Sequence, residues 1–270
     1  MPWFDHAGQR LHYVESGDGT PVLLVHGLGS STRDWEYQIP ELEKHHRVIA
    51  VDVRGHGQSD KPDERYSIAG FAADVIALIE HLALAPLHLV GISMGGMIGF
   101  ELATRRPDLL RSLTIVNSAP EVKPKTFREY LEVARRLFLA RVMGLDTVGK
   151  ALGKMLFPKP EQAELRRKIE QRWPQNDKRA YLSSLHAIIG WGVQERLGQI
   201  TCPTLVISAD NDYTPVSLKQ AYVDRLPSAR LVVIEDSRHA TPLDQPEQFN
   251  RTLLDFLEQV DLSQPARKCQ

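Results

Sequence analysis

The sequence has few cysteines and no long hydrophobic run. Its two cysteines in 270 residues, Cys202 and Cys269, are too few for a disulfide framework or a four-thiolate metal site. No uncharged apolar stretch approaches the roughly 18 residues that a membrane helix needs, and the first residues lack the basic and apolar regions of a signal peptide. We therefore expect a cytoplasmic protein without a membrane segment, in which Cys202 is a buried apolar residue.

An excess of charge of one sign is also absent. The chain has 33 basic and 34 acidic residues, a formal net charge of −1, whereas domains that bind nucleic acid are usually strongly basic. The composition, 42% hydrophobic and 25% charged, is that of an ordinary globular protein. A chain of this length can bury roughly three quarters of its unfolded surface, so it needs no metal ion or disulfide to hold its core. We expect no nucleic-acid partner.

Short apolar runs alternate along the chain with longer helical patterns. The runs are rich in Val, Ile and Leu and almost uninterrupted, which is typical of parallel strands covered on both faces; they lie at 21–26, 48–53, 87–92, 112–116, 204–208 and 230–234. Residues 11–15 alternate between apolar and polar and are predicted to form an antiparallel edge strand. Helical spacing occupies residues 68–84, 96–106, 217–225 and 247–260. This alternation predicts an α/β fold with a doubly wound, mostly parallel sheet.

The pattern changes between residues 120 and 198, where strand signals stop and prolines separate basic helical segments. Residues 121–198 hold 16 Lys and Arg against nine Asp and Glu, a surplus that we interpret as a solvated helix face. We predict that residues 120–198 form a helical cap, or lid, inserted into a core made of residues 1–119 and 199–262. Residues 263–270 are expected to be a flexible tail.

A glycine-rich string, Gly91-Ile92-Ser93-Met94-Gly95-Gly96, stands where the strand at 87–92 meets the next helix. A serine in so sharp a turn needs small residues two positions away on either side, because Cβ atoms there would collide. The turn lifts the serine hydroxyl above the sheet edge, at a helix amino terminus whose dipole stabilises negative charge. Ser93 is therefore a candidate nucleophile.

A second string, His26-Gly27-Leu28-Gly29, ends the strand at 21–26. An oxyanion needs two fixed N–H donors, and the natural pair is the backbone N–H of Leu28 and that of Met94, which follows the nucleophile. His26 lies in this turn rather than after a late strand, so we interpret it as a residue that organises the loop. The glycine-rich loop at 52–60 is interpreted as structural as well.

A serine nucleophile needs a base, and the base needs a third group to orient it. His239 follows the last predicted strand and precedes the final helix, which puts it at the same sheet edge as Ser93. Asp210 and Asp212 both follow the strand at 204–208, and proximity alone does not decide between them. After the earlier strand at 112–116 the sequence offers only Asn117, which could orient an imidazole but carries no charge.

Taken in this order, the motifs resemble the α/β-hydrolase superfamily over residues 4–262, and within it the serine esterase and 3-oxoadipate enol-lactonase-like group. The matching strings are residues 26–29, 52–60, 91–96, 209–212, 237–239 and 244–247. The resemblance implies an oxyanion hole at the N–H groups of Leu28 and Met94, a lid at 120–198, and a catalytic triad of Ser93, Asp212 and His239.

The same resemblance selects Asp212 over Asp210, because the family's acid stands three residues after the small residue that corresponds to Ala209. Two residues depart from the family pattern. Many members have glycine before the catalytic histidine, where this chain has Arg238, and the family's glycine in the acid turn is Ala209 here. The turn at Ala209 must therefore form without a positive φ at that residue.

A serine at the nucleophile position favours acyl transfer at a carbonyl. The resemblance therefore predicts a carboxylesterase or arylesterase that cleaves small esters through an acyl-enzyme, with no metal or organic cofactor. Hydrolysis of a lactone, either an enol-lactone or an acyl-homoserine lactone, is the second reading, and C–C bond hydrolysis the third. A ligand receptor that retains the triad is the non-enzyme alternative. Six residues of the cap could line the substrate pocket or belong to the cap's own core: Tyr130, Phe138, Leu156, Phe157, Trp173 and Trp191.

Overall fold

The computed structural model describes residues 2–124 and 126–264, and in them an eight-stranded sheet with the order β1-β2-β4-β3-β5-β6-β7-β8. The pairs β1–β2 and β2–β4 are antiparallel and the other five are parallel. This confirms the predicted α/β class with a mostly parallel sheet. The strands are β1 Trp3–His6, β2 Gln9–Ser16, β3 Thr20–Val25, β4 His46–Val51, β5 Leu87–Ile92, β6 Leu110–Val116, β7 Thr204–Ala209 and β8 Ala229–Ile234.

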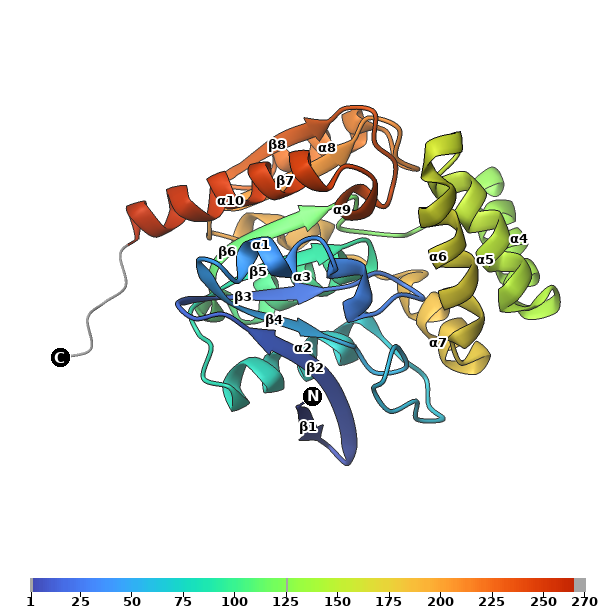
Figure 1. Ribbon diagram of the computed structural model, residues 1–270, viewed down its shortest axis with the longest axis horizontal. Helices are drawn as coiled ribbons and strands as arrows, with labels where there is room; N and C mark the ends of the chain where they lie inside the picture. The colour runs from blue at the N-terminus through green and yellow to red at the C-terminus, as the bar shows by residue number, and fades with distance from the viewer. Residues whose placement is uncertain (1, 125, 265–270) are drawn as a thin grey trace.

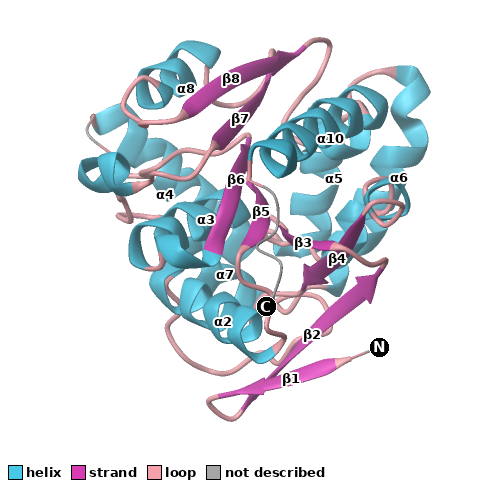
Figure 2. Cartoon of the chain, turned by 90° about the vertical axis from the view of Figure 1, so that its left-hand side faces the viewer, coloured by secondary structure: helices cyan, strands magenta, loops and turns pink. Residues whose placement is uncertain are grey.

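Helices cover both faces of the sheet (Figure 2). On one face, α2 (Ile68–His81), α3 (Met94–Arg105) and α8 (Val216–Val223) share a hydrophobic cluster with the strands. On the other, α1 (Ile39–Leu42) and α10 (Pro246–Ser263) form a second cluster. Strands such as β5 and β6 are buried at every residue, which explains why their sequences are continuously apolar rather than alternating.

Several element boundaries differ from the sequence predictions. Strand β1 was not predicted; it pairs with β2, which takes the place of the predicted edge strand at 11–15. Helix α3 starts directly after Ser93, before the predicted start at residue 96. Helix α10 continues to Ser263, so the first residue of the predicted tail is helical, and residues 265–270 lie outside the described part of the chain.

The segment between β6 and β7 is helical and lies at the end to which the arrows of the parallel strands, such as β3 and β6, point (Figure 1). Trp173 of this segment packs against Gly149, because a Cβ on Gly149 would lie only 2.6 Å from the Cβ of Trp173.

The predicted limits of the cap, residues 120 and 198, stay a prediction. The elements of this segment are α4 Phe127–Val142, α5 Gly144–Leu156, α6 Ala163–Arg172 and α7 Lys178–Ile188, with 3-10 turns η3 Pro160–Gln162, η4 Trp173–Gln175 and η5 Gln194–Gln199.

Candidate active site

Ser93 stands in a strained turn between β5 and α3. Its φ of +54° and ψ of −116° lie in a region that costs an L-residue roughly 1–3 kcal/mol. Glycines make the turn feasible: a Cβ on Gly91 would lie 2.2 Å from the carbonyl oxygen of Gly95, and one on Gly95 would lie 2.0 Å from that of Val25. The backbone N–H of Ser93 donates to the carbonyl of Val116 at 2.9 Å, which fixes the turn against β6.

The two predicted oxyanion donors flank this turn. Met94 is the first residue of α3, and Leu28 lies in the loop that follows β3. Within residues 2–124 and 126–264, neither backbone N–H donates a hydrogen bond, so both are free to bind an anion. The loop passes close to the serine, since a Cβ on Gly27 would lie 3.3 Å from that of Ser93.

His26 forms hydrogen bonds that fix residues 26–29, the loop that carries the predicted oxyanion donor Leu28 and is called the oxyanion loop below. Its Nδ1 donates to the carbonyl of Gly27 at 2.7 Å, and its Nε2 accepts from the backbone N–H of Val53 at 3.1 Å. Both ring nitrogens are thereby used in structural hydrogen bonds, and the ring is fully buried. This geometry fits the interpretation of His26 as a loop organiser and leaves it no nitrogen for proton transfer.

The loop at 52–60 supports the same region through Asp52. The buried carboxylate accepts from the backbone N–H of Thr32 at 2.7 Å, from that of Gln58 at 2.9 Å and from His12 Nδ1 at 2.8 Å. It therefore ties together the 3-10 turn η1 (Thr32–Trp35), the loop at 52–60 and strand β2. These bonds fit the interpretation of residues 52–60 as a structural loop.

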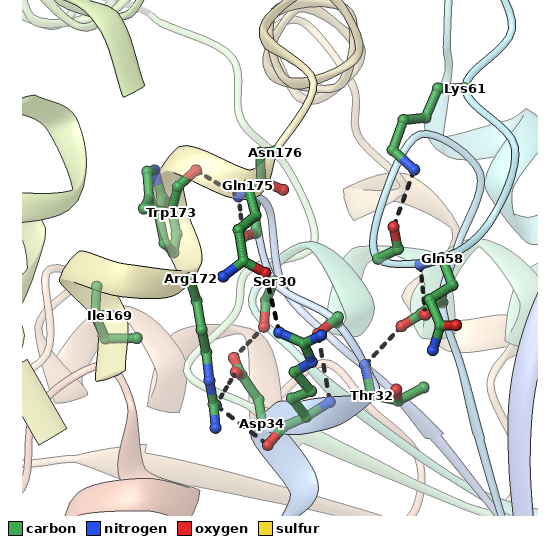
Figure 3. A pocket seen from close by; sticks show the side chains of 15 residues that line it. Ser30, Thr32, Asp34, Gln58, Lys61, Ile169, Arg172, Trp173, Gln175 and Asn176 are labelled. Carbon is green, nitrogen blue, oxygen red and sulfur yellow. Dashed lines mark hydrogen bonds and ion pairs between the residues drawn. The ribbon is translucent and has the colours of Figure 1, made fainter. Parts of the chain in front are cut away.

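The helical segment contacts the oxyanion loop from the other side (Figure 3). Asn176 Nδ2 donates to the carbonyl of Gly29 at 2.8 Å, and a Cβ on Gly29 would lie 2.6 Å from the Trp173 ring. Arg172 reaches Asp34 at 3.6 Å beside a polar cavity of about 130 Å³. Burial raises the pKa of Asp34, and a hydrogen bond from Ser30 partly opposes this shift.

Asp212 and His239 are in direct contact. His239 Nδ1 lies 2.6 Å from Asp212 Oδ1, and the Asp212 side chain is only 1% exposed. The second oxygen, Oδ2, accepts from Thr214 Oγ1 at 2.9 Å and from Lys219 Nζ at 2.5 Å. Burial raises the pKa of Asp212, but the hydrogen bond and charge of His239 and the ammonium of Lys219 outweigh it and hold the pKa well below its usual range. The carboxylate is therefore ionised.

Asp210 has a different position. Its two oxygens accept from the backbone N–H groups of Asp236, at 3.0 Å, and Ser237, at 2.9 Å. These bonds fix the loop between β8 and His239. Asp210 is thus a support of that loop, and the carboxylate on the imidazole is Asp212.

Asn117 links the nucleophile turn to the histidine loop. Its Nδ2 donates to the carbonyl of His239 at 2.9 Å, and its Oδ1 accepts from the backbone N–H of Ala209 at 2.8 Å. The next residue, Ser118, donates through Oγ to the carbonyl of Ser93 at 2.7 Å. Neighbouring residues of one strand end therefore contact both Ser93 and His239, which places the two at the same edge of the sheet. Asn117 contacts the backbone of His239 and not its ring.

Sequence reasoning missed three residues beside the histidine. The ring of Tyr213 stacks on that of His239 with centroids 4.1 Å apart. Asp244 accepts from the backbone N–H of Arg238 at 2.8 Å and from Ser237 Oγ at 2.9 Å, and burial raises its pKa to about 6. Lys219 is buried with its Nζ on Asp212. The sequence signal for Lys219 was its place three and four residues before the buried Tyr222 and Val223, on the inner face of α8.

The two departures from the family pattern are accommodated locally. Ala209 is the last residue of β7 and does not have a positive φ, so no glycine is needed there. The Arg238 guanidinium reaches the helical segment, where its Nη1 donates to the carbonyl of Met155 at 3.5 Å.

A groove of about 1050 Å³ borders the imidazole through Tyr213. It lies between α8 and the segment that follows β6, and none of the six predicted pocket residues lines it. The structure places these six elsewhere. Tyr130 and Phe138 are 59% and 61% exposed on α4, Leu156 and Phe157 are buried, Trp173 packs on the oxyanion loop, and Trp191 Nε1 donates to Glu101 at 3.0 Å. A role for any of them in substrate binding stays a prediction.

Comparison with known proteins shows the family. Residues 20–246 match the family described as alpha/beta hydrolase fold. The chain belongs to the α/β-hydrolase family. This hydrolase is 35% identical over 268 residues to a Variovorax paradoxus protein named "Putative carbamate hydrolase RutD", covering 93% of this chain and 97% of that one. A protein of the same name from Pseudomonas savastanoi is 32% identical over 258 residues, covering 92% and 97%.

Solved structures are similar over the same extent. The enol-lactonase from Burkholderia xenovorans has a TM-score of 0.87 and 27% identity, covering 95% of this hydrolase and 100% of the other chain. A thermophilic esterase from Thermogutta terrifontis has a TM-score of 0.84 and 26% identity, covering 96% and 97%. Both likenesses extend over the helical segment as well as the sheet.

Two features are absent from residues 2–124 and 126–264 of this hydrolase. No helix among them has the length and apolar character of a membrane span. No group of three or more His, Cys, Asp or Glu side chains in that part of the chain could hold a metal ion. Cys202 is buried and free, and burial raises the pKa of its thiol to about 11. A cytoplasmic location stays a prediction.

Proposed function

We propose that this hydrolase is a serine esterase that works through an acyl-enzyme, with Ser93 as nucleophile, His239 as base and Asp212 as the group that orients the base. The observation that carries the proposal is the contact of His239 Nδ1 with the ionised Asp212 at 2.6 Å, on the sheet edge where Ser93 occupies its strained turn. This contact leaves the other ring nitrogen, Nε2, available to accept a proton.

In the proposed reaction His239 Nε2 accepts the hydroxyl proton of Ser93 as Oγ attacks the ester carbonyl. The N–H groups of Leu28 and Met94 stabilise the oxyanion, and such a donor is worth roughly 10²–10³ in rate. The tetrahedral intermediate collapses, and the alcohol leaves with the proton from His239. A water molecule, deprotonated by His239, then attacks the acyl-enzyme. The acid product leaves and the hydroxyl of Ser93 is restored.

The substrate class we propose is a small carboxylic ester. The relatives' names support a carbonyl joined to a heteroatom leaving group, because carbamate, lactone and ester all share it. A lactone is the second candidate, favoured by the enol-lactonase likeness over 95% of the chain. Ring opening uses the same machinery, since the leaving alkoxide is merely tethered to the acyl group.

The test compares kcat/KM for short-chain p-nitrophenyl esters, aryl esters, five- and six-membered lactones and a p-nitrophenyl carbamate. Phenylmethylsulfonyl fluoride should add one sulfonyl group at Ser93, with loss of fluoride. Ser93→Ala should fold and lose roughly 10⁴–10⁶ in kcat, the range for serine-triad knockouts. Ser217→Ala, an exposed serine of α8, is the matched control and should keep full activity.

Two outcomes would contradict the proposal. Full activity in Ser93→Ala would exclude the serine mechanism. A single burst of product without turnover on every compound would instead indicate a ligand receptor that retains the triad. Preference for the lactones or the carbamate over all esters would keep the mechanism and change the substrate class.

A further inference from the structure

The ammonium group of Lys219 is enclosed in the interior behind the histidine. The side chain is 0% exposed, on the inner face of α8. Its Nζ lies 2.5 Å from Asp212 Oδ2, 3.0 Å from Ser208 Oγ and 3.1 Å from the carbonyl of Thr214. A protonated lysine has three N–H donors, and here each one has an acceptor. These three acceptors therefore fit the charged form of the Lys219 side chain.

Lysine is one of the residue types that are almost never buried without a partner. Burial lowers the pKa of Lys219, while the charge of Asp212 and its hydrogen bond act in the opposite direction. The partner is the same carboxylate that contacts His239. Asp212 thus divides its two oxygens, giving Oδ1 to the imidazole and Oδ2 to the ammonium and to Thr214. The pair of Lys219 and Asp212 is buried on both sides, so it is not an ordinary surface ion pair.

We propose that Lys219 is a positioning residue of the active site, which holds Asp212 with one oxygen toward His239 and offsets the carboxylate's charge at the imidazole. This inference rests on the proposed function of Asp212 and His239. The rotation of a carboxylate is fixed when both oxygens are bound, so the bond from Lys219 orients the bond to His239. Its positive charge also weakens the stabilisation that Asp212 gives to a protonated ring.

Few other ionisable groups face this pair among the described residues, and one of them is Tyr213, whose ring stacks on the imidazole with centroids 4.1 Å apart. Tyr222, on the same face of α8, is buried, and burial and the charge of Asp212 raise the pKa of its phenol. It therefore stays neutral. Arg238 points toward Met155, and the carboxylates of Asp210 and Asp244 are bound to backbone N–H groups of the histidine loop. Removing the Lys219 charge should therefore change mainly the field at His239.

The test uses the full chain with two substitutions, Lys219→Met and Lys219→Gln. Both remove the charge, and glutamine keeps an N–H donor for Asp212. In both variants the acid limb of the pH profile of kcat/KM should move upward by roughly one to two pH units, the order that a unit charge on the far oxygen of the shared carboxylate produces at an effective dielectric of about 20. Lys219→Met should also lose roughly tenfold in kcat, because Asp212 is less well oriented, and Lys219→Gln less. KM should stay unchanged, because Lys219 does not line the groove.

Lys159→Met is the matched control. Lys159 forms a partly exposed ion pair with Asp236 in the loop that carries His239, so its charge is screened by solvent. The control should keep the wild-type pH profile. The proposal is overturned if the acid limb moves no further in the Lys219 variants than in Lys159→Met. If Lys219→Met does not fold, Lys219→Gln alone decides the question.

A second readout separates this inference from the proposed function. The ring protons of His239 can be followed by NMR as pH is varied, with a His239→Gln sample to assign them, and this needs no substrate. An upward shift of the ring's titration midpoint in both Lys219 variants supports the coupling even if Ser93→Ala turns out to be active. An unchanged midpoint overturns it even if Ser93 proves to be the nucleophile.

Discussion

Asp210 Oδ1 accepts a 2.9 Å hydrogen bond from the backbone N–H of Ser237, so the first of two nearby aspartates supports the loop on which His239 lies. The second, Asp212, contacts the imidazole itself at 2.6 Å. The pair shares one turn and one strand end, yet the side chains point to different partners. Substitution of Asp212 should therefore lower mainly kcat, and substitution of Asp210 mainly stability.

Asp212→Asn should keep the fold and lower kcat by about 10⁴, as in a triad whose acid is replaced by its amide. Asp210→Asn should lower kcat less than about tenfold, because an amide still offers one acceptor oxygen to the loop. Its melting temperature should fall, since the second of two backbone N–H groups loses its acceptor. Steady-state kinetics and thermal unfolding of both variants test this. An inactive Asp210→Asn together with an active Asp212→Asn would reverse the assignment.

The nucleophile turn was predictable because part of its requirement is local. A Cβ on Gly91 would meet the backbone of Gly95 in the turn itself, whereas a Cβ on Gly95 would meet Val25 of the neighbouring strand β3. The apolar runs of the sheet were predictable for a similar reason, since a strand buried on both faces tolerates no polar alternation.

Lys219 was not predictable in the same way. A lysine on a helix is usually exposed. Its spacing to Tyr222 and Val223 puts Lys219 on their face of α8, but its contact with Asp212 depends on how α8 packs beside β7. The exposure of Tyr130 and Phe138 was not predictable either. Their hydrophobicity indicated a pocket wall or a core, whereas α4 leaves both largely exposed, and helical spacing does not show which face of a helix meets the rest of the protein. Their role in substrate binding stays a prediction.

Gly27→Ala tests how closely the oxyanion loop must approach the nucleophile. Gly27 does not have a positive φ, so alanine is compatible with the backbone, but its Cβ would lie 3.3 Å from that of Ser93. The loop must then move by a few tenths of an ångström. We expect a folded protein with kcat/KM lower by about tenfold, since small displacements of catalytic groups are costly. Gly198→Ala meets nothing within 4 Å and serves as the control. Equal kinetics in both variants would contradict the close approach.

Asn176→Ala tests whether the helical segment supports the oxyanion loop. The substitution removes the 2.8 Å bond from Nδ2 to the carbonyl of Gly29 and should cost about 1 kcal/mol of unfolding free energy. Because Gly29 follows Leu28, kcat should fall by roughly three- to tenfold with little change in KM. Gln175→Ala, which loses two exposed bonds, one from Arg33 and one to the carbonyl of Gln171, is the control and should keep kcat. Urea unfolding and kinetics on one ester measure both effects. A loss confined to stability would show that the bond does not position the donor.

The last prediction concerns Asp244, whose pKa burial raises to about 6 from an ordinary value of 3.8, against the opposing hydrogen bonds from Arg238 N–H and Ser237 Oγ. Since the folded protein binds this proton more tightly than the unfolded chain, the stability that it contributes is fully present below about pH 4. It is lost as pH rises through about pH 6 and then stays constant. Asp244→Asn is neutral throughout, and its amide can accept from Arg238 N–H and donate to Ser237 Oγ. The free energy of unfolding of the variant relative to wild type should therefore rise by roughly 1–3 kcal/mol between about pH 4 and pH 7.5.

Asp210→Asn is the control for this pH dependence, with the opposite sign. Burial raises the pKa of Asp210, but the N–H groups of Ser237 and Asp236 outweigh it and lower the pKa below the ordinary value. Its contribution to stability is therefore present above about pH 4 and is lost as pH falls through the folded-state pKa. Relative to wild type, Asp210→Asn should thus be less stable at pH 7.5 and recover toward acid pH, whereas Asp244→Asn gains as pH rises. Urea unfolding of the three proteins at four pH values measures both slopes. A difference in unfolding free energy between Asp244→Asn and wild type that is constant with pH would contradict a raised pKa of Asp244 in the folded protein. The Asp244 carboxyl would then be ionised at pH 7.5 in both the folded and the unfolded states.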